Sequence, residues 1–128
     1  MTGLLATEPR PVDVPALAAE ALWQELELTP KPGLVDRLNN GSHRDMDHAL
    51  FVRSIMAITP WFARFAELGE AHAAKPADRQ LRILRPMGMA CEQAMYAATG
   101  GVNTHKGGVF ALGLLCFAAG REIGRAHV

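Results

Sequence analysis

Residues 50–68, LFVRSIMAITPWFARFAEL, carry the clearest folding signal in the chain. Large apolar side chains recur there every three or four positions, as on one face of an α-helix: Leu50, Phe51, Ile55, Ile58, Phe62, Phe65 and Leu68. Asp45 or Asp47 can cap the start of this helix by accepting a hydrogen bond from a backbone N–H. Pro60 lies inside the pattern and predicts a kink or a division of the helix. Such an amphipathic helix needs partner helices to cover its apolar face.

Three further helices are predicted around this segment. Asp13 can cap a helix that runs toward Pro30, with Leu17, Ala21, Leu22, Trp23, Leu26 and Leu28 on its apolar stripe. Another helix is predicted from about Asp78 to Ala98, with Pro86 inside it, and a last one from Val109 to about Glu122. No alternating run predicts a strand. We therefore expect an all-α, multi-helical single domain over residues 13–128, preceded by a flexible tail over residues 1–12.

The composition excludes several classes of protein. Apolar residues make up 49 % of the 128 residues, which is enough for a core. The 13 basic and 13 acidic residues cancel, so no general attraction to nucleic acid or to an anionic membrane is expected. The N-terminus lacks the pattern of a signal peptide. Cys91 and Cys116 have neither zinc-site nor disulfide spacing, which predicts buried, reduced thiols and a cytoplasmic protein.

The last predicted helix is apolar on most of its faces. The run from Val109 to Ala119 is too short to span a bilayer and predicts a core helix. A helix of this kind needs neighbours on most sides, and four helices do not supply them. We therefore expect either a second subunit, in a homo-oligomer, or a chain that is part of something longer.

A polar, glycine-rich stretch, TGGVNTHKGG at residues 99–108, precedes that helix. Paired glycines permit positive φ and close approach of the backbone to a ligand. The N–H groups at the start of a helix, together with the charge of Lys106, favour an anion such as phosphate. Asn103, Thr104 and His105 add hydrogen-bonding groups. A turn closed by glycine is the alternative, and the stretch is not a Walker A loop because Lys106 precedes Gly107.

A second polar stretch, KPGLVDRLNNGSHRDMD at residues 31–47, lies between the first two predicted helices. Asp36, Asp45 and Asp47 are hard oxygen ligands of the kind that Mg²⁺ uses together with substrate phosphates. Lys31 and Arg37 can neutralise phosphate oxygens. A solvated loop whose aspartates only cap a helix is the alternative. A zinc site with His43 and His48 is disfavoured because the cluster has no cysteine and no familiar zinc spacing.

Glu92 lies three residues before Met95, on the same face of the third predicted helix. A glutamate on an otherwise apolar segment is either exposed or functional. Periodicity alone favours an exposed side chain.

Taken together, three strings resemble the triphosphoribosyl-dephospho-CoA synthase family. They are TPKPGLVDRLNNGSHRDMD at residues 29–47, Phe51 with Ser54, and LR..GM.CEQAMYAATGGVNTHKGGVFALGLL at residues 84–115. Their order and spacing match the family from about Ala18 to Gly120. Family members are longer than this chain, so the match corresponds to their N-terminal part. Part of the core and of the site is then expected to lie outside the matched region.

The resemblance implies an all-α enzyme that uses ATP and 3′-dephospho-CoA. The 2′-hydroxyl of dephospho-CoA attacks C1 of the ATP ribose, adenine leaves, and the triphosphate travels with the ribose. The transition state should have oxocarbenium character. The product is the precursor of the prosthetic group on the acyl carrier protein of citrate lyase or malonate decarboxylase.

The resemblance also implies roles for particular residues. The candidates for substrate and phosphate binding are Lys31, Arg37, Asn39, Asn40, Asn103, Thr104, Lys106 and Gly107. Asp36, Asp45 and Asp47 would hold the Mg²⁺ that accompanies ATP. The proton-transfer candidates are Asp36, His43, Glu92 and His105, without an assignment of acid and base among them.

Two other functions remain open. One is a truncated, catalytically incomplete relative that binds a nucleotide without turning it over. The other is an all-α metal phosphohydrolase that uses the histidines and aspartates. An adjacent His-Asp pair is expected of such a hydrolase, but His43 is followed by Arg44.

Overall fold

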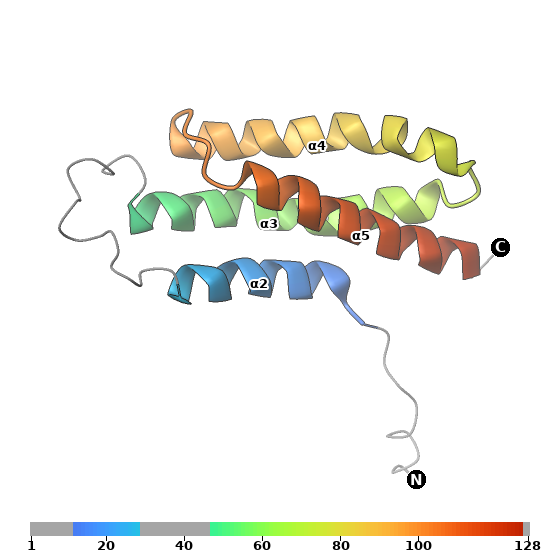
Figure 1. Cartoon of the computed structure of the whole chain (residues 1–128), viewed down its shortest axis with the longest axis horizontal. Helices are drawn as coiled ribbons and strands as arrows, with labels where there is room; N and C mark the ends of the chain where they lie inside the picture. Colours follow the sequence, from blue (N-terminus) through green and yellow to red (C-terminus); the bar gives the residue numbers. More distant parts are fainter. Residues whose placement is uncertain (1–11, 29–46, 127–128) are drawn as a thin grey trace, which may run out of the picture.

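The computed structural model describes residues 12–28 and 47–126. These ranges contain four α-helices and no strand: α2 (Val14–Leu28), α3 (His48–Ala71), α4 (Ala77–Thr99) and α5 (Lys106–Ala126). The helices lie side by side with their long axes roughly aligned (Figure 1). The all-α prediction is confirmed.

The helices α3 and α5 form the central pair of the bundle, and they run in the same direction. The helices α2 and α4 run the opposite way and pack on either side of that pair (Figure 1). The ends of α2 and α4 and the starts of α3 and α5 therefore lie at one end of the bundle, on the left in Figure 1. This end gathers the residues that flank both polar stretches.

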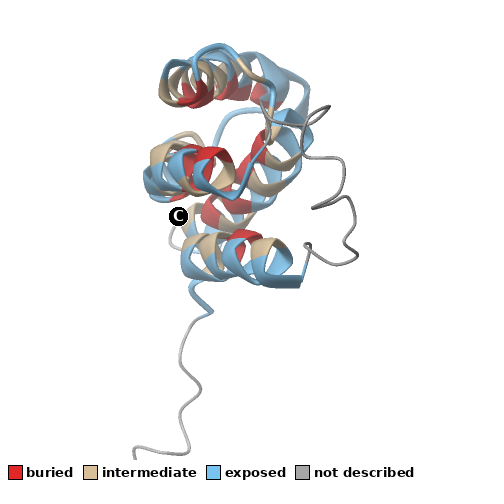
Figure 2. Cartoon of the chain, turned by 90° about the vertical axis from the view of Figure 1, so that its left-hand side faces the viewer, coloured by how far each residue is buried: buried red, intermediate tan, exposed pale blue. Residues whose placement is uncertain are grey.

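The core is built on the apolar stripe of α3. Ile55, Ile58 and Phe62 have no exposed surface, and Phe65 is 1 % exposed. The other helices add the remaining buried side chains around this stripe: Ala18, Leu22, Leu84, Cys91, Met95, Val109, Cys116 and Phe117. The buried parts of the helices face one another across the bundle (Figure 2). Burying each large apolar side chain contributes roughly 1.5–3 kcal/mol to folding.

Glycines allow α3 and α5 to pack closely. A Cβ atom at Gly69 would overlap the carbonyl oxygen of Phe117, and one at Gly120 would overlap the carbonyl oxygen of Ala66. A Cβ atom at Gly113 would lie 2.9 Å from the ring of Phe65. The two backbones can approach this closely only where neither helix carries a side chain.

Of the kink or division predicted at Pro60, the division does not occur, because α3 continues from His48 to Ala71. A proline inside a helix leaves the carbonyl four residues earlier without its N–H partner. Pro60 and Met56 are both exposed, so water can reach that carbonyl. The same holds for Pro86, which lies inside α4 on the exposed side, four residues after exposed Arg82.

The predicted helix caps are confirmed where the structure describes them. The Oδ1 atom of Asp13 accepts a hydrogen bond from the backbone N–H of Ala16 at 3.0 Å. The Oδ1 atom of Asp47 accepts one from Leu50 at 2.9 Å, which makes Asp47 the N-cap of α3. Asp45, the other candidate for this cap, lies outside the described residues.

The apolar stripe expected on the first helix is too wide. Ala18 and Leu22 are buried, whereas Leu17, Trp23 and Leu28 are 53 %, 37 % and 71 % exposed. Among the described helices, α2 packs mainly against α3 and α5, which cover a narrow stripe of its surface.

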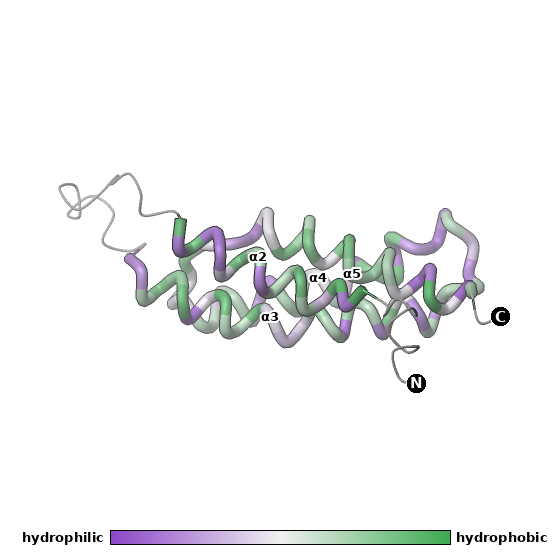
Figure 3. Tube along the Cα trace, turned by 90° about the horizontal axis from the view of Figure 1, so that it is seen from below, coloured by the Kyte–Doolittle hydropathy of each residue, from purple (hydrophilic) through white to green (hydrophobic). Residues whose placement is uncertain are grey.

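The helix α5 keeps a large apolar face exposed, as the expectation of a missing neighbour requires. Exposed side chains on it include Phe110, Leu114, Leu115 and Ile123. Apolar residues recur along the whole trace of the bundle (Figure 3). By length and composition alone, α5 is long and apolar enough to cross a membrane. One such helix is weak evidence for a membrane protein, because the core helix of a soluble protein passes the same test. Its other face packs against α2, α3 and α4, as a core helix does.

Candidate active site

The loop between α4 and α5 is held by hydrogen bonds to the end of α4. Gly100 and Gly101 have φ of 68° and 94°, values that glycine adopts without strain. The buried Oγ1 of Thr99 lies 2.9 Å from the carbonyl oxygen of Met95 and 2.8 Å from that of Val102. It also accepts the N–H of Val102 at 3.1 Å. The first glycine pair therefore forms the predicted turn.

The second glycine pair differs from the prediction. Gly107 and Gly108 lie inside α5 and do not have positive φ. The Oδ1 atom of Asn103 accepts the N–H of Lys106 at 3.1 Å and so caps the helix. A Cβ atom at Gly107 would meet no atom of the described residues within 4 Å, so none of them covers this position of the first turn.

His105 lies against α3 and α4. Its Nδ1 atom is 2.7 Å from the hydroxyl oxygen of Ser54. The hydroxyl of Thr104 donates a hydrogen bond to the same serine oxygen at 2.6 Å. The backbone N–H of His105 donates to the sulfur of Met95 at 3.2 Å. The rings of His105 and Phe51 meet edge to face, with centroids 5.4 Å apart. The loop is thereby fixed to the two helices by side chains.

The surroundings of His105 favour a neutral ring. Partial burial lowers the pKa of His105 below its ordinary value of 6.5, and the negative charge of Glu25 on α2 opposes this effect. Because burial is the larger cause, His105 is uncharged near neutral pH. A neutral imidazole has one nitrogen that donates and one that accepts.

Lys106 and Glu92 form an ion pair across α4 and α5, with Nζ and Oε2 3.2 Å apart. The side chain of Glu92 is only 14 % exposed, so the prediction of an exposed glutamate is wrong. The start of α5 covers it, an effect that the periodicity of α4 cannot show. The side chain of Lys106 remains 49 % exposed, so its ammonium group can also contact an anion from solution.

Of the three predicted metal ligands, only Asp47 lies in the described residues. One of its oxygens caps α3, and the side chain is exposed. Residues 12–28 and 47–126 contain no group of three His, Cys, Asp or Glu side chains placed to hold a metal ion. Several predicted site residues lie outside the described residues: Lys31, Asp36, Arg37, Asn39, Asn40, His43 and Asp45.

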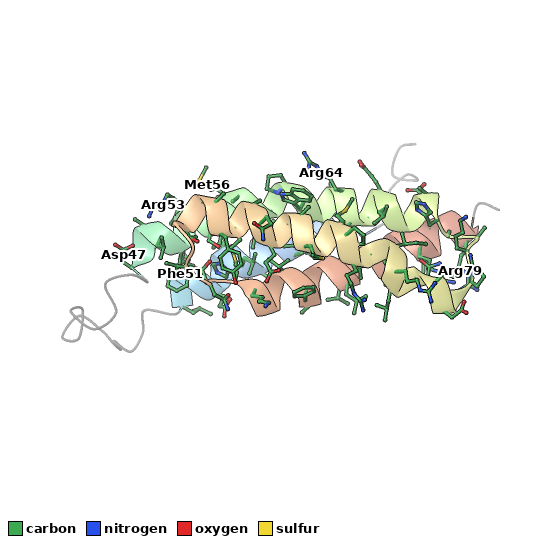
Figure 4. The ribbon with its side chains drawn as sticks, turned by 90° about the horizontal axis from the view of Figure 1, so that it is seen from above. Asp47, Phe51, Arg53, Met56, Arg64 and Arg79 are labelled. Atoms are coloured by element: carbon green, nitrogen blue, oxygen red, sulfur yellow. The ribbon has the colours of Figure 1, made fainter. Side chains whose placement is uncertain are left out.

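The structure brings together five of the predicted residues, Asn103, Thr104, His105, Lys106 and Glu92, and adds others that were not predicted. Ser54, Met95 and Phe51 contact His105, and Glu25 acts on it through its charge. Asp47 and Phe51 lie toward the same end of α3, whereas Arg53 points outward (Figure 4). A signal for Ser54 exists in the sequence, because this polar residue lies on the buried stripe between Leu50 and Ile58.

The two cysteines are buried, free thiols, as predicted. Burial raises the pKa of Cys91 to about 12 and that of Cys116 to about 11. A thiol must ionise to act as a nucleophile, so neither cysteine is suited to that role.

Comparison with known proteins decides the family. Residues 11–128 match the family described as ATP:dephospho-CoA triphosphoribosyl transferase. The chain belongs to this family. The resemblance noted in the sequence is thus confirmed over nearly the whole chain. No solved structure shows significant similarity.

Relatives with the same printed function are very similar in sequence. The chain is 62 % identical over 109 residues to the 2-(5″-triphosphoribosyl)-3′-dephosphocoenzyme-A synthase of Pectobacterium atrosepticum, covering 85 % of the chain and 36 % of that relative. It is 61 % identical over 115 residues to the probable synthase of Pectobacterium carotovorum, covering 90 % of the chain and 38 % of that relative. The matched region therefore corresponds to less than two fifths of these relatives' length.

Proposed function

We propose that the chain takes part in the transfer of the 5-triphosphoribosyl group of ATP to the 2′-hydroxyl of 3′-dephospho-CoA, with release of adenine. The observation that carries this proposal is the family match over residues 11–128. The grouping of His105, Lys106 and Glu92 at one end of the bundle supports it. The end of α2 and the start of α3, which flank the other polar stretch, lie at that same end (Figure 1).

The proposed reaction breaks one bond and forms another at C1 of the ATP ribose. The bond from C1 to the adenine nitrogen breaks, and a bond from C1 to the 2′-oxygen of dephospho-CoA forms. The hydroxyl proton must leave, and adenine must gain a proton or a hydrogen bond as it departs. Since the triphosphate is not cleaved, the site has to bind it without activating its phosphorus atoms.

The start of α5 is suited to bind the triphosphate. The first N–H groups of a helix have no partner within the helix, and they face anions at its positive end. Lys106 adds a half-exposed ammonium group beside Gly107, a position that none of the described residues covers. Asn103 and Thr104 complete the polar loop, and Lys31, Arg37, Asn39 and Asn40 are proposed to contribute from the other polar stretch.

Magnesium enters this proposal as part of the substrate, MgATP. Mg²⁺ on a nucleotide is commonly held by one or two carboxylates in addition to phosphate oxygens and water. Asp36, Asp45 and Asp47 are the proposed carboxylates. Asp47 is compatible with this role because its side chain is exposed and the cap of α3 uses one of its two carboxylate oxygens.

The product, its carrier and the setting are also proposed. The product would be the prosthetic-group precursor for the acyl carrier protein of citrate lyase or malonate decarboxylase. The two reduced cysteines agree with the cytoplasm as the setting. A second subunit or a further polypeptide segment would cover the exposed face of α5, and light scattering of the purified chain would distinguish a homo-oligomer from a monomer.

Release of adenine tests the proposal directly. The purified chain is incubated with ATP, Mg²⁺ and 3′-dephospho-CoA, and free adenine is measured by chromatography. We expect adenine only when dephospho-CoA is present. Stabilisation by ATP without adenine release would instead identify an incomplete nucleotide-binding relative. Release of phosphate or pyrophosphate would identify the phosphohydrolase.

Substitutions at the two polar stretches test the proposed residues. Asp36→Ala and Lys106→Ala should abolish adenine release while helical content, measured by circular dichroism, stays largely intact. Lys75→Ala is the matched control, because Lys75 is an exposed lysine in the turn between α3 and α4, at the opposite end of the bundle. A fully active Lys106→Ala or Asp36→Ala variant would exclude that residue from the site.

A further inference from the structure

The hydroxyl of Ser54 is a polar group in an apolar environment. Ser54 has no exposed surface, and neither do its neighbours Ile55 and Ile58 on the inner face of α3. A hydroxyl buried in this way is destabilising unless it forms hydrogen bonds. Its two partners, Thr104 and His105, both come from the loop before α5, at 2.6 Å and 2.7 Å.

These two contacts restrict where the protons lie. A serine hydroxyl has one proton, so Ser54 can donate to only one partner. The hydroxyl of Thr104 donates to Ser54, which leaves the serine proton for Nδ1 of His105. In the reverse arrangement Nδ1 would donate to Ser54 and Ser54 to Thr104. The half-buried hydroxyl of Thr104 would then need another acceptor.

We propose that Ser54 is a positioning residue that holds the neutral ring of His105 with its proton on Nε2. A neutral imidazole whose Nδ1 accepts a hydrogen bond must carry its proton on Nε2. Thr104 orients the serine hydroxyl, and Phe51 and Met95 hold the ring and backbone of His105 in place. The negative charge of Glu25 on α2 also acts on this ring, without deciding which nitrogen carries the proton.

This arrangement narrows the role of His105, on the condition that the proposed function is correct. The ring would offer the substrate an N–H donor and not a lone pair. A donor suits a phosphate oxygen or a nitrogen of the departing adenine. It does not suit the base that removes the proton from the 2′-hydroxyl, which leaves that task to one of the other candidates, Asp36, His43 or Glu92.

The tautomer can be measured without any substrate. The chain is labelled with ¹⁵N-histidine, and the ring nitrogens are correlated with the ring protons by NMR near neutral pH. The signals missing from His105→Gln belong to His105. His72 provides an internal control, because its Nδ1 lies 3.1 Å from the carbonyl oxygen of Leu68, which can only accept. Its neutral ring should therefore carry the proton on Nδ1.

We expect opposite tautomers for the two histidines, with the proton of His105 on Nε2. Ser54→Ala should lower the ratio of the Nε2–H tautomer of His105 to its Nδ1–H tautomer by about tenfold, which is the effect of losing one buried hydrogen bond. Ser54→Thr, which keeps a hydroxyl, should restore the ratio. A proton on Nδ1 of His105 in the unmodified chain would overturn the proposal, as would an unchanged ratio in Ser54→Ala.

A second substitution covers the case in which Ser54→Ala does not fold. Thr104→Val has nearly the same shape but lacks the hydroxyl that orients Ser54, so it should also lower the ratio. An unchanged ratio in a folded Thr104→Val variant would overturn the ordered chain of hydrogen bonds. None of these spectra depends on adenine release. A failure of the tautomer proposal is therefore distinguishable from a failure of the proposed function.

Discussion

His105 takes its properties from residues that are distant in the sequence. Ser54, which is 51 residues away, contacts one ring nitrogen, and Glu25 on another helix acts on the ring through its charge. The neighbouring Lys106 is paired with Glu92 on α4. None of these side chains is an unusual chemical group when it is considered alone. The chemical character of the loop comes from their combination.

Two substitutions at position 105 separate a donor from a base. If His105 only donates a hydrogen bond, His105→Gln should keep more adenine release than His105→Ala, because a carboxamide also has an N–H donor. Loss of one such donor commonly lowers kcat by roughly 10²–10³. Steady-state kinetics of both variants would measure the difference. Equal and complete losses would favour a proton-transfer role for His105.

The stability of the chain should depend on His105 in acid. Its pKa in the folded protein is lower than the value of 6.5 expected after unfolding, so between these two values the unfolded state binds more protons. The free energy of unfolding should therefore be highest above pH 6.5 and decrease as the pH falls through this window. Urea unfolding at several pH values, compared between the unmodified chain and His105→Gln, would measure it. The same slope in both proteins would contradict the prediction.

At the scale of the elements, the contact between α3 and α5 depends on the absence of side chains. Gly69 and Gly120 lie where the backbone of one helix meets the other, and Gly113 faces the ring of Phe65. Glycine normally destabilises a helix by about 1 kcal/mol relative to alanine. At these positions close packing offsets that effect.

Gly120→Ala should therefore destabilise the bundle although alanine is the better helix former. The added Cβ atom would overlap the carbonyl oxygen of Ala66, and overpacking of this kind costs roughly 1–3 kcal/mol. Gly107→Ala is the matched control in the same helix, where the added atom meets none of the described residues within 4 Å. It should be neutral or stabilise by about 0.4–1 kcal/mol. Thermal unfolding of both variants would test this contrast, and equal midpoints would argue against the close contact.

At the scale of the whole molecule, the bundle leaves apolar side chains of α4 and α5 exposed. A pocket of about 170 Å³ opens between α4 and α5. Its lining is mainly apolar: Phe65, Leu81, Leu84, Arg85, Gly88, Val109, Phe110 and Leu114. Leu81, Phe110 and Leu114 are exposed and line this pocket, so apolar surface of both helices faces solvent there.

An apolar fluorescent dye should bind at this pocket. Leu114, which lines it and is 47 % exposed, can be replaced by lysine with little effect on the core. Leu114→Lys should lower dye fluorescence in the folded chain because it places a charge in the pocket. Leu17→Lys is the matched control, since Leu17 is 53 % exposed on α2 and does not line the pocket. A similar decrease in both variants would show that the dye does not bind preferentially between α4 and α5.

Much of the fold could be predicted because helix formation is a local property. The apolar period, the caps Asp13 and Asp47, and the turn at Gly100 all act within a few residues. The errors have a common cause. Whether Pro60 divides its helix depends on whether that side of the helix faces solvent. Whether Leu17 is covered depends on how many helices pack against α2.

The candidate site shows the same division. The sequence alone identified the family and the polar residues of the loop before α5, because long, unusual strings of residues are specific without any structure. Which side chains meet depended on the tertiary structure. Ser54 reaches His105, and Glu92 reaches Lys106, only because α3, α4 and the start of α5 pack together at one end of the bundle. A hydrogen bond or an ion pair requires atoms within a few ångströms. For residues far apart in the chain, only the packing of the helices decides that distance.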